Sequence, residues 1–404
     1  MHVLLLALNY HPDRLGNAPL MTGLAEGLVA RGHRVTVVCA FPHHETGRIE
    51  APYRGRLFAR DAHNGVDIHR VWLYAPEGGA AAKMANYASF TATALAAALA
   101  VGPVDVVFTP SPPLTLGLVD AALARWRGVP FVYNLQDLFP EAAVRLGVLT
   151  NPRVIGAFER LEKLVYRRAT RLAVISEGFR QHLLARGVPD GKIAVIPNFA
   201  DVDFITPRPR AGNPFREAHG LDETFVVQFS GRMGYSQGLE TVVEAWKRLG
   251  DLPDLRLMMV GDGQARPMVD AALGDDPRVV LLPTQAREDL PDLLAAADVG
   301  LAPLRHGMAG TSVPSKMFGI MAAARPIIAG VDAGSDAEAL VQTADCGRVV
   351  PPEDPAALAD AIRAAHADRA MSQAQGERGR AHVVAHYAQA AVVDAYERLL
   401  RSIT

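Results

Sequence analysis

The chain has 404 residues, of which 50% are hydrophobic, and its 41 basic and 43 acidic side chains leave a formal net charge of −2. This length predicts two domains with sizeable cores, and the near-balanced charge gives no reason to expect a nucleic-acid partner. The first residues, Met1–Leu8, lack the basic segment and cleavage site of a secretory signal and instead predict a strand. Polar side chains interrupt the alanine-rich run 83–101, so a helix outside the membrane is expected there.

Short apolar runs alternate with helical patterns through the first half of the chain. This alternation is typical of a parallel, doubly wound sheet, because buried parallel strands are apolar on both faces and are connected by helices. Strands are predicted at 2–8, 34–39, 67–73, 105–109, 130–134, 171–175 and 193–196, and helices at 18–31, 82–101, 113–126, 151–169 and 177–186.

A proline-rich connector follows Pro197, and a second alternating series begins after it. Its strands are predicted at 224–229, 255–260, 278–282, 298–302, 326–329 and 347–350. The expected fold class is therefore α/β, with two doubly wound Rossmann-like domains facing a cleft. Ligands of such sheets bind at the carboxyl ends of the strands.

Charge is distributed unevenly between the two halves. Residues 1–196 carry 21 basic and 15 acidic side chains, a balance of +6, whereas the remainder carries 20 and 28, a balance of −8. A basic first half favours an anionic partner, either phosphate or a membrane surface. The alternative interpretation is that the uneven distribution of surface charge has no functional role.

The stretch after the strand 298–302 has the pattern of an anion site. Small residues precede a predicted helix, with Ser312 as its N-cap and Pro314 in its first turn. Free backbone N–H groups and the helix dipole would face an anion, and Lys316 would add a positive charge. An ordinary strand–helix unit with a surface lysine explains this stretch equally well.

Two other loops contain glycines that could bring the backbone close to a ligand. Gly16 and Asn17 follow the first strand, but the pattern is not that of a nicotinamide dinucleotide site. In the second half, Arg232 lies between Gly231 and Gly234 and could hold a phosphate through two hydrogen bonds. The first loop is as consistent with a loop that has no binding role. The glycines of the second could form only a tight turn, but the arginine between them favours a function.

Gln136, Asp137 and Glu141 follow the strand 130–134. The two carboxylates, four positions apart, could carry out acid–base chemistry, or they could be a turn residue and an acid in the first turn of a helix. The glycine turn at 260–263 is interpreted as structural.

No metal site is expected from the cysteine and histidine spacing. Cys39 and Cys346 lie far apart and predict two buried thiols in a reducing compartment. The pair at His43 and His44 does not have metal-ligand spacing and predicts a solvated loop.

Several longer motifs, in order along nearly the whole chain, resemble family 4 of the glycosyltransferases, whose fold is GT-B. They are RGHRVTVV at 31–38, ISEGF at 175–179, VIPNFADVDFI at 195–205, GRMGYSQGLETVVEAW at 231–246, MVGDG at 259–263, LPDLLAAADVGLAPL at 290–304 and SVPSKMFGIMAAARPIIA at 312–329. The chain most resembles the branch that builds lipid-linked bacterial surface polysaccharides, which includes N-acetylfucosamine transferases of O-antigen and capsule.

The resemblance implies roles for individual residues. Gly16 would lie near the donor diphosphate and Arg232 would hold it. The loop before the helix 313–324 would cover the donor sugar, and the N-terminus of that helix would face phosphate. Together with the patterns described above, the candidate catalytic residues are Gln136, Asp137 and Glu141, and the candidate donor-binding residues are Gly16, Asn17, Arg232, Gly234, Gln237, Gly261, Thr311, Ser312, Ser315 and Lys316.

Three departures from the family pattern affect this site. The usual lysine after the diphosphate-binding arginine is Gln237, and the histidine of the catalytic loop is Gln136. The two glutamates eight positions apart are Thr311 and Gly319, so no residue is assigned to the ribose contact. Lys316 could replace the charge of the missing lysine.

The resemblance implies retaining transfer of a hexosyl or N-acetylhexosaminyl unit from a UDP-sugar to a saccharide on polyprenyl diphosphate. Residues 1–200, with a C-terminal helix at 388–404, would form the acceptor-side domain, and residues 201–387 the nucleotide-sugar domain. No cofactor or metal is required if positive side chains and helix N-termini neutralise the leaving diphosphate.

The protein is expected to be cytoplasmic and peripheral at the inner face of the plasma membrane. The segment 41–60 would face anionic lipid through its arginines, which are Arg48, Arg54, Arg56 and Arg60. Two alternatives are a nucleotide-sugar 2-epimerase of the same fold, which would release an isomerised sugar, and an inactive nucleotide-binding subunit of a polysaccharide assembly complex.

Overall fold

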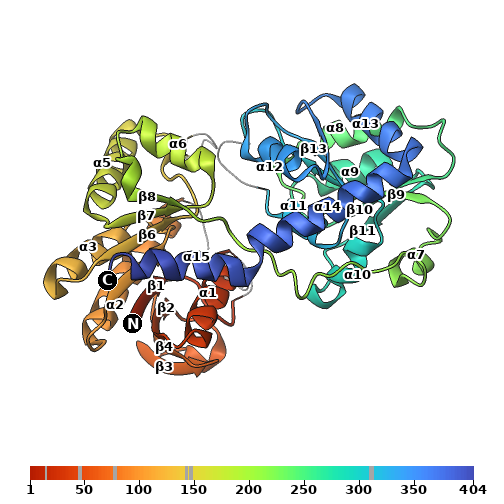
Figure 1. Cartoon of the computed structure of the whole chain (residues 1–404). Helices are drawn as coiled ribbons and strands as arrows, with labels where there is room; N and C mark the ends of the chain where they lie inside the picture. The colour runs from red at the N-terminus through yellow and green to blue at the C-terminus, as the bar shows by residue number, and fades with distance from the viewer. Residues whose placement is uncertain (14–15, 44–47, 76–79, 142–143, 145–148, 309–313) are drawn as a thin grey trace. The chain divides into compact units, whose positions relative to one another are not determined.

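The computed structural model describes residues 1–13, 16–43, 48–75, 80–141, 144, 149–308 and 314–404. The chain forms two compact units (Figure 1). The first unit consists of Met1–Asn198 together with Gln389–Thr404, and the second of Phe199–Ala388. The chain therefore passes between the units twice.

The first unit contains an eight-stranded sheet in the order β3-β4-β2-β1-β5-β6-β7-β8. Neighbouring strands are parallel except for β3 and β4, which are antiparallel. In β1, the residues from Val3 to Leu6 are completely buried, because the sheet is covered on both faces. The strands are β1 (His2–Ala7), β2 (Arg34–Ala40), β3 (Phe58–His63), β4 (Val66–Val71), β5 (Val106–Pro110), β6 (Phe131–Leu135), β7 (Arg171–Val174) and β8 (Ile193–Val195).

The helices of the first unit pack closely at two glycines. They are α1 (Ala18–Ala30), α2 (Ala80–Ala100), α3 (Leu116–Arg127), α5 (Pro152–Arg168), α6 (Glu177–Ala185) and α15 (Gln389–Arg401). A Cβ added to Gly27 of α1 would lie 2.7 Å from Val393 of α15, and one added to Gly117 of α3 would lie 2.5 Å from Val165 of α5. The C-terminal helix, blue in Figure 1, thus packs against the first helix, in red.

The second unit contains a six-stranded parallel sheet in the order β11-β10-β9-β12-β13-β14. This is the order of the doubly wound nucleotide-binding fold. The strands are β9 (Phe225–Ser230), β10 (Leu255–Val260), β11 (Val279–Leu282), β12 (Val299–Pro303), β13 (Ile327–Gly330) and β14 (Gly347–Val350). The helices are α7 (Pro214–Ala218), α8 (Leu239–Lys247), α9 (Arg266–Leu273), α10 (Leu290–Ala295), α11 (Lys316–Ala322), α12 (Asp336–Ala344), α13 (Pro355–Ala367) and α14 (Arg369–Tyr387).

The α/β class and the doubly wound sheets predicted from the sequence are confirmed, and every predicted strand is present in the described chain. The strand β3 was not predicted. It lies at the edge of its sheet, and its partly exposed sequence, FARDAH, lacks the apolar run of a buried strand.

The helix predicted at 313–324 is shorter than expected. It begins at Lys316, with Ser315 as its N-cap, so the prediction that Pro314 lies in its first turn is wrong. At the other end, Ala324 has a φ of 55° and the N–H of Arg325 donates to the Ile320 carbonyl at 3.0 Å, which closes the helix. The predicted N-cap, Ser312, lies outside the described residues.

Candidate active site

Ligands of doubly wound sheets bind where successive connections leave in opposite directions. This point lies between β9 and β12 in the second unit and between β1 and β5 in the first. The loops that follow these four strands therefore contain the first candidates for binding, and among them are Arg232 and Asn17, which the sequence analysis had already selected.

The loops after β9 and β10 pack backbone against backbone. A Cβ added to Gly261 would lie 2.0 Å from the Gly231 carbonyl oxygen, and one added to Gly263 would lie 2.5 Å from that of Met233. Both positions also have a positive φ, of 135° and 147°, which disfavours any other residue. These glycines give the loop that carries Arg232 its shape.

Arg232 is exposed, whereas the next residue, Met233, is completely buried. The buried methionine anchors the loop, and the arginine side chain extends into solvent. No described residue forms an ion pair or hydrogen bond with the Arg232 guanidinium. Its five N–H donors are therefore available to an anion.

Lys316 is the first residue of α11, and its side chain reaches the loop after β9. The ammonium donates a hydrogen bond to Gln237 Oε1 and lies 3.9 Å from the centroid of the Phe229 ring. It is also 3.8 Å from the point where a Cβ on Gly231 would lie. The Lys316 charge thus occupies the loop in which the resemblance implied a lysine at position 237.

Burial lowers the pKa of the Lys316 ammonium to about 7, well below the usual value for lysine. Its neighbours in this loop are a neutral amide and an aromatic ring, and neither compensates the charge as a carboxylate would. At neutral pH the group is therefore divided between its charged and neutral forms. An anion nearby would favour the charged form.

Arg305, which the sequence analysis assigned no role, joins the two loops at the switch point. Its guanidinium donates to the Tyr235 carbonyl at 2.7 Å and to Glu240 at 2.7 Å, and it lies 4.0 Å from the Tyr235 ring centroid. Its backbone N–H donates to the Ser236 carbonyl at 2.9 Å. These contacts fix the short 3₁₀ turn that contains Gln237.

In the first unit, the structure brings Asn17 and Gln136 to the same edge of the sheet. The Asn17 amide donates to the Ser111 carbonyl at 2.8 Å, and the Gln136 backbone N–H donates to the Ser111 hydroxyl at 3.1 Å. Gly16, beside Asn17, has a φ of 62°, so this turn uses the conformational freedom of glycine. Ser111 follows β5 and was not predicted.

Asp137 and Glu141 have different surroundings. Asp137 is exposed, between the buried residues Gln136 and Leu138. Glu141 instead pairs with Arg186 at 3.1 Å and with His182 at 3.2 Å, both from α6 or its C-cap. Asp137 is thus the more accessible carboxylate at the end of β6.

Of the residues predicted to bind the donor in the second unit, those that lie in the loop after β9 or contact it are Arg232, Gly234, Gln237, Gly261 and Lys316. Ser315 is the exposed N-cap of α11, and its hydroxyl makes no capping hydrogen bond. Thr311 and Ser312 lie outside the described residues. Gly319 lies on α11 beside apolar side chains, since a Cβ there would be 3.4 Å from Leu294 and 3.9 Å from Ile205.

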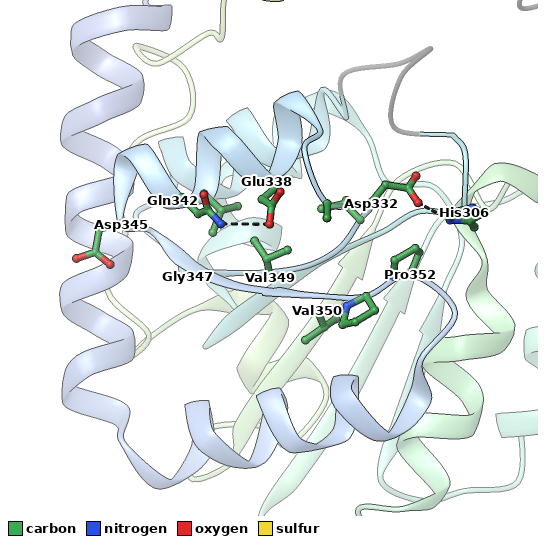
Figure 2. A pocket seen from close by; sticks show the side chains of 13 residues that line it. His306, Asp332, Glu338, Gln342, Asp345, Gly347, Val349, Val350 and Pro352 are labelled. Carbon is green, nitrogen blue, oxygen red and sulfur yellow. Dashed lines mark hydrogen bonds and ion pairs between the residues drawn. The ribbon is translucent and has the colours of Figure 1, made fainter. Parts of the chain in front are cut away.

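A hollow of about 670 Å³ lies along β14 and α12 and is also lined by His306 from the loop after β12 (Figure 2). Its lining includes Asp332, Glu338 and Asp345, and His306 pairs with Asp332 at 2.6 Å. The carboxylates would repel a diphosphate. This hollow therefore suits a diphosphate less well than the exposed Arg232 side chain does.

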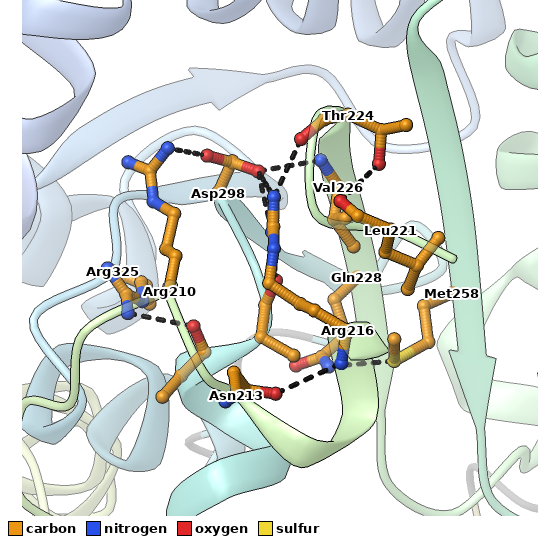
Figure 3. A network of polar contacts seen from close by, with 12 residues as sticks. Arg210, Asn213, Arg216, Leu221, Thr224, Val226, Gln228, Met258, Asp298 and Arg325 are labelled. Carbon is orange, nitrogen blue, oxygen red and sulfur yellow. Dashed lines mark hydrogen bonds and ion pairs between the residues drawn. The ribbon is translucent and has the colours of Figure 1, made fainter. Parts of the chain in front are cut away.

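The opposite end of β12 is held by a buried ion pair (Figure 3). Asp298, just before the strand, accepts hydrogen bonds from Arg216 at 3.2 Å and from the Val226 backbone at 2.8 Å, and it also pairs with Arg210. Arg216 is 1% exposed and further donates to the Ala296 carbonyl at 2.6 Å. This network fixes β12 to β9, the two strands that flank the switch point.

Within the described parts of the chain, no three histidine, cysteine, aspartate or glutamate side chains lie together as a metal site would require.

Comparison with known proteins identifies two matching family models. "Glycosyl transferase 4-like domain" matches residues 16–198, and "Glycosyl transferases group 1" matches residues 224–368. The chain is 32% identical to the probable glycosyltransferase WbjE of Pseudomonas aeruginosa over 64% of this chain and 65% of that protein, which is just under two thirds of its length. It is 26% identical to the putative colanic acid biosynthesis glycosyl transferase WcaI of Escherichia coli over 90% of this chain and 92% of WcaI.

The fold matches solved structures over the whole chain. HepE of Anabaena in complex with UDP has a TM-score of 0.73 at 17% identity, and the alignment covers 100% of both chains. At this identity the match shows the fold alone.

Proposed function

Because the chain belongs to family 4 of the glycosyltransferases, with the GT-B fold, we propose that it transfers a hexosyl or N-acetylhexosaminyl unit from a UDP-sugar to a lipid-linked saccharide. Transfer would retain the anomeric configuration and extend a cell-surface polysaccharide. In support, WcaI is named for colanic acid biosynthesis, and HepE has been solved with UDP and with UDP-glucose.

The observation that carries this proposal is the pair of cations beside the Gly231 loop. Arg232 is exposed and has no partner among the described residues, and Lys316 reaches the same loop from α11. A nucleoside diphosphate carries at least two negative charges, which these two side chains can match. Arg232 can bind two phosphate oxygens at once, whereas Lys316 acts as a point charge.

This arrangement suits the departure of a diphosphate from a sugar. As the glycosidic bond breaks, negative charge develops on the phosphate oxygens, and cations already in place stabilise it without reorganising. The diphosphate would also raise the pKa of Lys316 and draw a proton onto it. On the acceptor side, the exposed Asp137 carboxylate could accept a hydrogen bond from the acceptor hydroxyl.

The acceptor side of the proposal includes a membrane contact by the segment around β3. Arg54 and Arg56 are exposed, and they are followed by Leu57, which is 75% exposed, and Phe58, which is 44% exposed. Arg60 lies 5.9 Å from the Phe58 ring centroid. Apolar side chains between arginines suit an anionic lipid surface, which attracts the cations and takes up the apolar groups. No helix in the described chain has the length and hydropathy to cross a bilayer.

The proposal is tested by incubating the purified protein with UDP-glucose, UDP-N-acetylglucosamine and other UDP-sugars. Each donor is combined with a synthetic saccharide on polyprenyl diphosphate, and UDP release and the product mass are measured. We expect one donor to give UDP together with an acceptor extended by one sugar. An isomerised sugar would instead identify an epimerase, and UDP binding without turnover of any donor would identify an inactive subunit.

A further inference from the structure

Three side-chain amides form a chain at the end of β6, in which Asn134 and Gln136 are buried and Asn198 is half-buried. The Gln136 amide nitrogen donates to Asn134 Oδ1 at 2.7 Å and to Asn198 Oδ1 at 3.0 Å. The Asn198 amide nitrogen donates in return to Gln136 Oε1 at 2.8 Å. Gln136 and Asn198 therefore form a reciprocal pair, and both amide protons of Gln136 are used within the protein.

The orientation of this chain of amides is set by a backbone carbonyl. Asn134 donates to the Ala173 carbonyl at 3.2 Å and to the Tyr396 hydroxyl at 3.1 Å. Because a carbonyl only accepts hydrogen bonds, the NH₂ group of Asn134 must face Ala173, and its oxygen must face Gln136. This in turn directs the NH₂ group of Gln136 at both asparagine oxygens and fixes the orientation of Asn198.

The network joins β6 to the two parts of the first unit that adjoin the passages between the units. Asn198 is the last residue of the first unit before the first passage, and Tyr396 lies on α15, which follows the second. The Gln136 backbone, bound to Ser111, continues the network to the switch point of the first unit. Gln136 is 8% exposed, and the exposed Asp137 follows it directly.

We propose that Asn198 is a positioning residue for glycosyl transfer, which acts through its amide pair with Gln136 to fix the place of Asp137. Gln136 itself does not meet the substrate, because its donors are occupied by Asn134 and Asn198. The inference rests on the proposed function, in which Asp137 faces the acceptor.

The test uses Asn198→Asp, which can restore the pair only when protonated. A neutral carboxylic acid donates its proton to Gln136 Oε1 and accepts from the Gln136 amide with its other oxygen, as the asparagine does. The ionised carboxylate has no proton to donate, so it places a second acceptor oxygen against Gln136 Oε1 and breaks the reciprocal pair. We therefore expect the ratio of variant to wild-type kcat to rise as the pH falls. In mildly alkaline buffer the kcat should be at least about tenfold lower than that of the wild type, which corresponds to about 1.4 kcal/mol of activation free energy.

Two further measurements distinguish positioning from a general loss of structure. The affinity for UDP, which the second unit would bind, should remain within about twofold of the wild type. In parallel, the protection of the Gln136 backbone amide against hydrogen exchange, compared with the wild type at the same pH, should fall in alkaline buffer and recover in acid. The matched control is Asn151→Asp, in which the exposed N-cap of α5 undergoes the same chemical change and can still accept from the Arg153 N–H.

A wild-type kcat for Asn198→Asp at every pH, or a parallel loss of UDP affinity and kcat, would overturn the proposal. If the wild-type protein transfers no sugar, the proposed function fails. The exchange measurement then still tests the pair, and unchanged protection of Gln136 in Asn198→Asp would reject it as a positioning contact.

Discussion

The Lys316 ammonium donates a hydrogen bond to Gln237 Oε1, although the two residues are 79 positions apart in the sequence. A lysine on α11 thus supplies positive charge to a loop whose own residue at position 237 is neutral. No carboxylate among the described residues pairs with the ammonium, and burial lowers its pKa to about 7. Two predictions concern this lysine.

Replacing Lys316 by methionine should lower the affinity or the rate with the UDP-sugar donor at least tenfold, about 1.4 kcal/mol. Methionine keeps most of the apolar stem and removes the charge, so the melting temperature without ligand should change little. The control is Lys247→Met, because Lys247 is an exposed lysine on α8 that pairs with Glu244. Full activity of Lys316→Met would show that the donor charge is matched by other groups.

UDP binding should take up protons in neutral and mildly alkaline solution. In the free protein Lys316 loses its proton as the pH rises through about 7, whereas a bound diphosphate should raise its pKa. UDP affinity should therefore fall as the pH rises above this value, with up to one proton taken up per UDP. Calorimetry in buffers of different ionisation enthalpy measures this uptake. Equal uptake in Lys316→Met would assign the proton to another group.

Replacing Arg232 by alanine should weaken donor binding or turnover by tens- to thousands-fold. The lost charge-assisted contact corresponds to roughly 2–5 kcal/mol at a site shielded by the bound ligand. Arg248→Ala is a suitable control, since Arg248 is also an exposed arginine of the second unit but lies at the C-cap of α8. The assignment is wrong if titration with UDP gives the same dissociation constant for Arg232→Ala and the wild type.

Changing both Arg54 and Arg56 to glutamate should reduce sedimentation with vesicles that contain anionic lipid. Each lost cation near such a surface is worth about 1 kcal/mol, and reversal of the charge adds repulsion. The control changes Arg153 and Arg160, two exposed arginines of α5, to glutamate, which alters the net charge equally. An equal loss in both variants would show that net charge, and not the segment around β3, determines binding.

Replacing Asp298 by alanine should destabilise the second unit by about 3–5 kcal/mol, because Arg216 would remain buried and charged without its partner. Urea denaturation of the protein, followed by a probe in this unit, measures the change in its free energy of unfolding. For comparison, Asp254→Ala removes a more exposed carboxylate that pairs with Arg369, and it should have a much smaller effect. Similar losses in the two variants would show that the buried network contributes no more than a surface pair.

The positions of most strands, the α/β class and the position of Arg232 after a strand could be derived from the sequence, whereas the order of the strands in each sheet could not. Buried parallel strands are short apolar runs, and the helices between them have a different period, so local pattern alone locates both. The sequence also placed Arg232 between glycines, and the structure shows the physical need for the neighbouring Gly261. The local pattern did not predict the edge strand β3, because that strand is partly exposed and lacks an apolar run. It also misplaced the start of α11, where no side-chain capping hydrogen bond marks the first turn.

The contacts that define the candidate site were decided by the tertiary structure. Nothing in the local sequence around Lys316 shows that it reaches Gln237, and nothing around Gln136 shows that it pairs with Asn198, 62 residues away. A residue's backbone conformation depends largely on its near neighbours, whereas a side-chain hydrogen bond depends on which distant segments the sheet order brings together. The sequence around Gln136 does not show whether its side chain is exposed or buried, and only the tertiary structure, which brings Asn134 and Asn198 to its amide, made it buried and paired.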